Sequence, residues 1–192
     1  MILASNSKRR QEILRDMGFN FKVLTSDIEE ISDKEEISEM ILDIAEKKLD
    51  KIAKENVSEF VLAADTVVEL EGRIFGKPKS REEAESFLKI LSGKTHKVIT
   101  AYVLKNISKN IIIKDVVISK VKFFDLDDET INWYLDTSEP FDKAGAYGIQ
   151  GKGRVLVEKI EGDYFAIMGF PISNFLKNLR KNGYNISQID RI

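Results

Sequence analysis

One aspartate interrupts an otherwise apolar stretch of the sequence. Asp65 lies in residues 61–68, where Val61-Leu62-Ala63-Ala64 precede it and Thr66-Val67-Val68 follow it. Burying a charge without a partner is costly, so such a carboxylate either faces a cleft at a strand end or is paired inside the protein. A carboxylate in a cleft can hold a metal ion, activate water, or do both. Asp65 is therefore the candidate catalytic residue.

A second candidate is the polar and basic segment at residues 5–10, Ser-Asn-Ser-Lys-Arg-Arg. A short apolar run precedes it and an amphipathic stretch follows, which predicts a strand, a turn and the start of a helix. The free N–H groups and positive dipole end of a helix attract anions, and arginine forks bind phosphate. Ser7, Arg9 and Arg10 are thus candidate phosphate ligands, and a capped helix start with solvated cations is the alternative.

Three other segments carry groups that could act on phosphate or on a ligand. The Gly-Lys-Pro at residues 76–78 presents Lys77, whose ammonium could neutralise charge as a phosphate bond breaks, although a surface turn would look the same. Four glycines fall within residues 145–153, either because a base or sugar approaches the backbone or because the loop packs tightly. Glu29 and Glu30 are spare carboxylates that could share a metal with Asp65.

The composition removes several kinds of chemistry. The chain has no cysteine and one histidine, His96, so thiolate sites and histidine-rich metal sites are excluded, and a metal would need carboxylate ligands, which favours Mg²⁺ or Mn²⁺. His96 has no Gly-x-Ser-x-Gly motif near it, and we expect a structural role. With 30 basic and 32 acidic side chains, the chain has no global field for polyanions, so we expect a local phosphate site and no nucleic-acid partner.

The N-terminal sequence lacks the pattern of a signal peptide, and no apolar run reaches the length of a membrane span. A cytoplasmic protein without membrane contact is therefore expected.

Apolar spacing and turn residues predict alternating strands and helices. We expect helices at residues 8–17, 35–54, 80–91 and 171–181, with Ser7 and Ser80 as caps of the first and third. A further helix is expected to be capped by Asp127 or Asp128 and to stop before Glu139-Pro140. We expect strands at residues 1–4, 19–25, 60–70, 73–75, 95–107, 110–124 and 155–160. Trp133 is expected in the core. This order favours one domain over residues 1–192 of the mixed α/β (α+β) class. It would have a curved mixed sheet with long antiparallel hairpins, flanking helices, and two lobes around a cleft.

Taken in order, these segments resemble the signature of the Maf family, also called septum-formation-inhibitor proteins. The matching segments are residues 3–10 (LASNSKRR), 63–68 (AADTVV), 76–78 (GKP), 92–96 (SGKTH) and 142–151 (DKAGAYGIQG). The resemblance spans nearly the whole chain. It implies an inosine-triphosphatase-like fold and the hydrolysis of a nucleoside triphosphate to monophosphate and pyrophosphate with a divalent metal.

The resemblance also implies roles for single residues. Asp65 matches the family's proton acceptor, and with Lys77 it forms the expected catalytic pair, while Asp65 and Glu30 are the expected metal ligands. The positions that match phosphate-handling residues of the family are Ser7, Arg9, Arg10, Lys48 and Lys77.

The pattern of Arg10, Thr66 and Gln150 resembles the branch of the family that acts on dTTP and UTP. A glutamine amide donates and accepts at once, which suits the edge of uracil or thymine. Modified pyrimidine nucleotides, a 7-methyl-GTP pyrophosphatase and a non-catalytic nucleotide-binding regulator of cell division stay open as alternatives, as does a homodimer.

Overall fold

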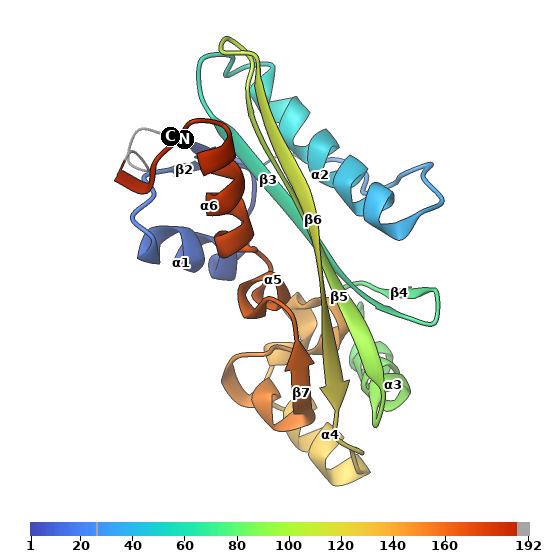
Figure 1. The fold of residues 1–192 in the computed structure, drawn as a ribbon. Helices are drawn as coiled ribbons and strands as arrows, with labels where there is room; N and C mark the ends of the chain where they lie inside the picture. The colour runs from blue at the N-terminus through green and yellow to red at the C-terminus, as the bar shows by residue number, and fades with distance from the viewer. Residues whose placement is uncertain (26, 188–192) are drawn as a thin grey trace. The chain divides into compact units, whose positions relative to one another are not determined.

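The computed structural model describes residues 1–25 and 27–187 and contains one mixed sheet with helices around it (Figure 1). Within these residues the sheet has seven strands in the order β2-β1-β3-β5-β6-β7, and β4 pairs with β3. The strands are β1 (Ile2–Leu3), β2 (Lys22–Val23), β3 (Val61–Leu70), β4 (Arg73–Phe75), β5 (Thr95–Asn106), β6 (Ile111–Phe123) and β7 (Val157–Glu161). Strand β1 is parallel to β2 and β3, whereas the β3–β4 and β6–β7 pairs are antiparallel. The mixed α/β class expected from the sequence is confirmed.

Among the described residues, five of the six α-helices lie where the sequence predicts a helix. The α-helices are α1 (Lys8–Asp16), α2 (Ile37–Ala53), α3 (Arg81–Leu91), α4 (Asp128–Leu135), α5 (Tyr164–Met168) and α6 (Ile172–Lys181). Three 3₁₀ helices lie between α4 and β7, namely η1 (Glu139–Asp142), η2 (Ala144–Ala146) and η3 (Gly151–Leu156). Among the described residues, no helix combines the length and apolar character that a membrane span requires.

The chain forms two compact units. The first unit comprises Met1–Asp65, Thr100–Val117 and Gly169–Ile192, and the second comprises Thr66–Ile99 and Ile118–Met168. Strands β3, β5 and β6 each contribute residues to both units. The two units correspond to the two lobes expected from the sequence, while the cleft and the single domain over residues 1–192 stay predictions.

In the first unit, helices cover both faces of the strands, with α2 on one side and α1 and α6 on the other (Figure 1). Alternate residues of β3 point to opposite faces. Val61 and Ala63 pack in one apolar cluster with Leu49 of α2. On the other face, the Tyr102 ring of β5 lies edge-on to Phe175 of α6 at 5.3 Å between centroids. A strand buried on both faces needs a continuous apolar run, which explains the stretch before Asp65.

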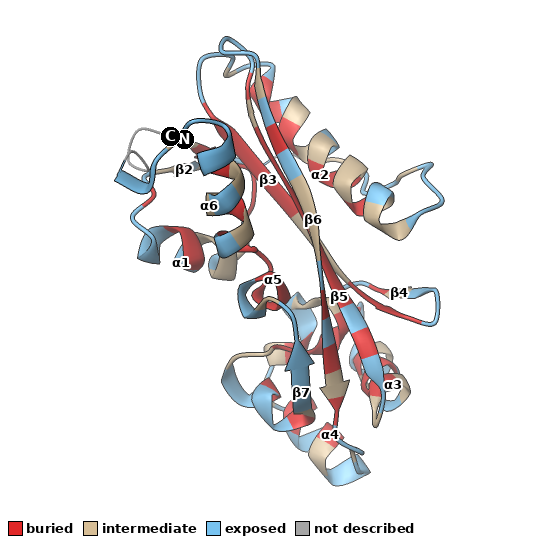
Figure 2. Ribbon diagram, in the orientation of Figure 1, coloured by how far each residue is buried: buried red, intermediate tan, exposed pale blue. Residues whose placement is uncertain are grey.

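The second unit has its own core, shown as buried segments in Figure 2. Phe75 at the end of β4 lies edge-on to Phe87 of α3, with 5.2 Å between ring centroids. His96, Phe123 and Tyr147 form a second aromatic group, with centroid separations of 4.6 to 5.3 Å. Tyr147 belongs both to this core and to residues 145–153, which we call the glycine-rich segment. The core therefore supports that segment.

The predicted helix caps are confirmed. The backbone N–H of Arg10 donates to Ser7 Oγ at 3.5 Å, that of Glu83 to Ser80 Oγ at 3.2 Å, and that of Thr130 to Asp127 Oδ1 at 2.8 Å. Each cap satisfies a backbone donor that the first helical turn leaves without a partner.

Three sequence-based predictions differ from the structure. The strand expected at residues 19–25 contains only Lys22–Val23, because the Phe19 N–H donates to Leu14 O and closes α1 instead. Trp133 is not in the core: it is 46% exposed on α4, where Lys152 Nζ lies 5.8 Å from its ring centroid. The 3₁₀ helices of residues 139–156 and helix α5 were not predicted.

Candidate active site

Asp65 is paired with a lysine. Lys48 Nζ on α2 lies 2.7 Å from Asp65 Oδ1, and their side chains are 17% and 13% exposed. Asp65 follows Val61 and Ala63 at the two-residue spacing of a strand, so it continues the row of β3 that faces α2. Of the two situations expected for a carboxylate in an apolar strand, the structure therefore shows the paired one.

Lys48 binds a second carboxylate as well. Its Nζ lies 2.7 Å from Glu30 Oε1, and Glu30 is 60% exposed. One ammonium thus brings Asp65 and Glu30 together, although they are far apart in the sequence. Lys48, Glu30 and Asp65 are therefore neighbours in the structure, while their roles in one site stay predictions.

Residues 27–31, which we call the acidic segment, are held on α2 by two further lysines. Lys47 Nζ donates to the carbonyl of Ile31 at 2.9 Å, and Lys51 Nζ donates to the carbonyl of Asp27 at 2.5 Å. Lys47 and Lys51 are four residues apart, so they lie on the same side of the helix. The acidic segment is therefore fastened at both ends, with Glu30 between them.

Arg10 is fixed by two hydrogen bonds. Its Nε donates to the carbonyl of Gly169 at 2.8 Å, and its Nη1 donates to Ser5 Oγ at 3.1 Å. Burial lowers the pKa of the Arg10 guanidinium, the charges of Asp65 and Glu30 oppose this effect, and Arg9 adds to it. Arg10 therefore lies within the electrostatic reach of both carboxylates and of Arg9.

Ser5 belongs to the candidate segment at residues 5–10, but neither Ser5 nor Gly169 was given a role of its own from the sequence. Ser5 is 8% exposed, and its Oγ accepts from the Ser7 N–H at 3.3 Å in addition to Arg10. Ser5 and Ser7 look alike in the sequence, but Ser7 caps α1 and Ser5 supports Arg10. The signal in the sequence was that Ser5 directly follows the apolar residues 1–4, a place where a side chain can be buried.

Three predicted site residues belong to the second unit. Lys77 is exposed in the loop between β4 and α3, Thr66 follows Asp65 in β3, and Gln150 is half-buried at the start of η3. The N–H of Gly145 donates to the carbonyl of Gly76 at 3.0 Å. This bond joins the loop that carries Lys77 to the glycine-rich segment. The roles of Lys77, Thr66 and Gln150 stay predictions.

Close packing accounts for two of the four clustered glycines. A Cβ on Gly153 would lie 2.3 Å from the carbonyl oxygen of Gly148. Gly145 has a φ of +68°, and a Cβ there would lie 2.8 Å from Val68 Cγ2. Only glycine fits such positions without a shift of the neighbours, so at these two residues the tight-packing interpretation applies.

The structural role expected for His96 is confirmed. The ring is 1% exposed, and its Nε2 lies 2.7 Å from the Tyr147 hydroxyl oxygen. Burial lowers the pKa of His96 to about 4. Nδ1 has no hydrogen-bond partner among the described residues. His96 therefore supports the glycine-rich segment as a neutral side chain.

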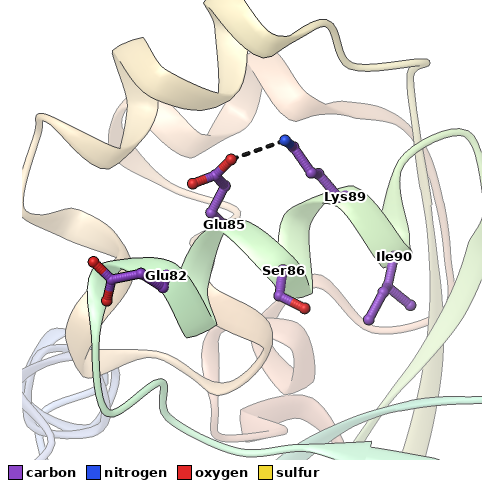
Figure 3. Close-up of a pocket in the computed structure, with 5 residues that line it drawn as sticks. All are labelled: Glu82, Glu85, Ser86, Lys89 and Ile90. Carbon is purple, nitrogen blue, oxygen red and sulfur yellow. Dashed lines mark ion pairs between the residues drawn. The ribbon is translucent and has the colours of Figure 1, made fainter.

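A surface hollow lies over helix α3 (Figure 3). Its lining residues all come from that helix, and two of its charged groups, Glu85 and Lys89, pair with each other at 2.8 Å. It has the character of a solvated helix face. The candidate site is instead the charged group of the first unit, formed by Arg9, Arg10, Glu30, Lys48 and Asp65.

The donor set suits a hard cation that is shared with a ligand. Among the described residues, no group of three or more His, Cys, Asp and Glu side chains could hold a metal by itself. Asp65 and Glu30 nevertheless converge on one cationic group. Mg²⁺ is often bound by one or two carboxylates together with substrate phosphates. The two carboxylates fit that arrangement.

Comparisons with known proteins identify a family and several relatives of this chain. A family model described as Maf-like protein matches residues 1–182. A dTTP/UTP pyrophosphatase of Fusobacterium nucleatum is 79% identical over 192 residues, which cover 100% of both chains. The protein of the same name from Pyrococcus furiosus is 46% identical over 98% of both chains. Among solved structures, the Staphylococcus aureus Ham1 protein gives a TM-score of 0.46 at 15% identity, covering 65% of this chain and 71% of that one.

Proposed function

Since the chain belongs to the Maf family, we propose that it is a pyrophosphatase that hydrolyses dTTP and UTP to the nucleoside monophosphate and pyrophosphate. The observation that carries the proposal is the convergence of Asp65, Glu30 and Lys48 beside Arg10. Relatives that match the full chain bear the name of this activity. The proposal includes modified pyrimidine nucleotides as substrates.

In the proposed reaction, Asp65 orients a water molecule and accepts its proton. The water oxygen forms a bond to the α-phosphorus, the bond from that phosphorus to the bridging oxygen of the β-phosphate breaks, and pyrophosphate leaves with the electron pair. Lys48 holds the Asp65 carboxylate in place through its 2.7 Å contact. Asp65 can take this role because its position is fixed before substrate arrives.

The phosphate groups would be bound mainly at the start of α1. Ser7 and Arg9 lie at its N-terminus, and Arg10 is held by Ser5 and Gly169. An arginine fork that is already ordered loses less conformational freedom on binding. Lys77 would add a further cation to the leaving pyrophosphate. Ser7, Arg9, Arg10, Lys48 and Lys77 are thus the proposed phosphate-binding residues.

We propose Mg²⁺ or Mn²⁺ as the cofactor. Asp65 and Glu30 would hold it together with phosphate oxygens, and a divalent ion in that position supplies Lewis-acid polarisation of the phosphates. The cytoplasmic location and the choice between monomer and homodimer stay predictions.

The test is pyrophosphate release by the purified chain from a panel of canonical and modified triphosphates, with Mg²⁺ and with Mn²⁺. We expect dTTP and UTP to be the best substrates. The Asp65→Asn variant should lose a factor of about 10² to 10⁴ in kcat. Asp50→Asn is the matched control, because Asp50 also pairs with a lysine, Lys105, at 2.7 Å, and it should keep the native rate.

Three results would contradict the proposal. Release of pyrophosphate from dTTP by Asp65→Asn at the native rate would remove Asp65 from the reaction. Activity confined to 7-methyl-GTP would overturn the substrate assignment. Nucleotide binding without any turnover would favour the regulator of cell division instead.

A further inference from the structure

Residues 148–153 form a closed loop in the second unit with Gln150 near its tip. The loop ends meet at Gly148 and Gly153, where a Cβ on Gly153 would lie 2.3 Å from the Gly148 carbonyl oxygen and 3.0 Å from its nitrogen. Gly151 turns the chain at the tip with a φ of +63°. Gln150 is therefore carried by a short loop whose two ends are in contact.

Two side chains hold this loop by its backbone N–H groups. The Tyr134 hydroxyl accepts from the Gly148 N–H at 3.0 Å. The Glu139 carboxylate accepts from the Lys152 N–H at 3.0 Å and from the Gly153 N–H at 3.3 Å. The bonds lie on both sides of Gln150 along the chain, so its backbone is fixed from both directions.

The two side chains also support each other and are themselves anchored. Tyr134 is fully buried in α4. Burial raises the pKa of its hydroxyl, and a hydrogen bond to the Glu139 side chain raises it further, so the hydroxyl donates to that carboxylate. Glu139 begins η1, immediately before the buried Pro140. The hydroxyl and the carboxylate thus form one connected polar group beneath the loop.

We propose that Glu139 and Tyr134 are positioning residues that fix Gln150 for recognition of the pyrimidine base. A glutamine side chain rotates about several bonds, and its amide can select a base edge only if its backbone is held. This inference rests on the proposed function, in which Gln150 contacts the base. Neither Glu139 nor Tyr134 is expected to contact the reacting phosphorus.

The experiment compares affinity for the whole nucleotide with affinity for its phosphates alone. The probes are α,β-methylene-dTTP, which resists cleavage between its α and β phosphates, and inorganic tripolyphosphate, which has no base. Both are titrated calorimetrically into wild type, Glu139→Gln, Glu139→Ala and Tyr134→Phe. Glu158→Gln is the matched control, because this exposed carboxylate pairs with Lys122 at 2.8 Å and lies outside the loop.

We expect Glu139→Ala to weaken binding of α,β-methylene-dTTP by about tenfold, the factor that corresponds to the loss of about one hydrogen bond to the base, with tripolyphosphate affinity unchanged. Glu139→Gln keeps one acceptor oxygen and should lose less, and Tyr134→Phe should lose part of the same selectivity. The control should match wild type with both probes. If Glu139→Ala does not fold, the other two variants carry the test.

A variant in the Gln150→Ala background shows whether the effect runs through Gln150. Glu139→Gln should weaken nucleotide binding much less once Gln150 has been replaced, because there is no amide left to position. An equal loss in both backgrounds, or an equal loss for nucleotide and tripolyphosphate, would overturn the inference. A wild-type chain that binds the analogue but releases no pyrophosphate from dTTP would refute the proposed function while leaving this comparison intact.

Discussion

The sole histidine should make the stability of the protein fall between pH 7 and pH 5. His96 is 1% exposed, and burial lowers its pKa from 6.5 to about 4. The His96 ring therefore takes up a proton near pH 6.5 in the unfolded chain but only near pH 4 in the folded chain. Stability rises with pH wherever the unfolded state binds more protons. The His96 contribution is thus fully present above pH 6.5 and is lost as the pH falls towards 4.

The size of the effect follows from the two pKa values. At pH 5, nearly all unfolded molecules carry the proton and few folded ones do, which corresponds to about 2 kcal/mol of lost unfolding free energy relative to pH 7. Screening by solvent does not reduce this free-energy change, because the ring is buried. This loss of unfolding free energy can be assigned to His96, since the chain has one histidine and carboxylates titrate at lower pH.

Urea unfolding at several pH values between 7 and 5 measures this free energy. Wild type should lose about 2 kcal/mol more over that range than His96→Gln, which has no titrating ring. The imidazole signal in a proton NMR titration of the folded protein should stay constant down to pH 5. An NMR midpoint near 6.5 in the folded chain would show that burial does not lower the pKa of His96.

Two more predictions follow from the packing of loops. Gly153→Ala should lower the unfolding free energy by about 2 kcal/mol, because its Cβ would clash with the Gly148 carbonyl, whereas Gly76→Ala has open space and should cost less in the same urea assay. Lys47→Met combined with Lys51→Met should release the acidic segment, so the glutamate-specific protease Glu-C should cut there faster than in wild type. Unchanged cleavage would show that the two lysines do not hold it.

The sequence predicted the elements whose signals are local. Ser80 precedes a helix with a buried stripe and caps it as expected. Helix η3 escaped prediction because Glu139, 13 to 14 residues earlier in the chain, accepts hydrogen bonds from N–H groups at its start. Helix α5 has five residues, too few for periodicity, although Asp163 caps it through the Phe165 N–H at 2.8 Å.

The partner of Asp65 could not be deduced from local pattern alone. Lys47, Lys48 and Lys51 occur together in α2, and nothing in their residue type separates them. Each residue of a helix is turned by about 100° from the one before it. Lys48 therefore meets Asp65 and Glu30, while its two neighbours reach carbonyls of the acidic segment. Their orientation depends on how α2 packs on β3, which is a tertiary property.

The proposed function requires a chain with a formal charge of -2 to bind a polyanion. Two carboxylates beside the proposed phosphate site would repel the polyanion, but Lys48 lies 2.7 Å from each of them. Lys48, Arg9 and Arg10 carry three positive charges against the two negative charges of Asp65 and Glu30, so this group has a net charge of +1. Coulomb attraction at short range outweighs the weak field of distant, screened surface charges. Local pairing, rather than the net charge, therefore decides what this surface attracts.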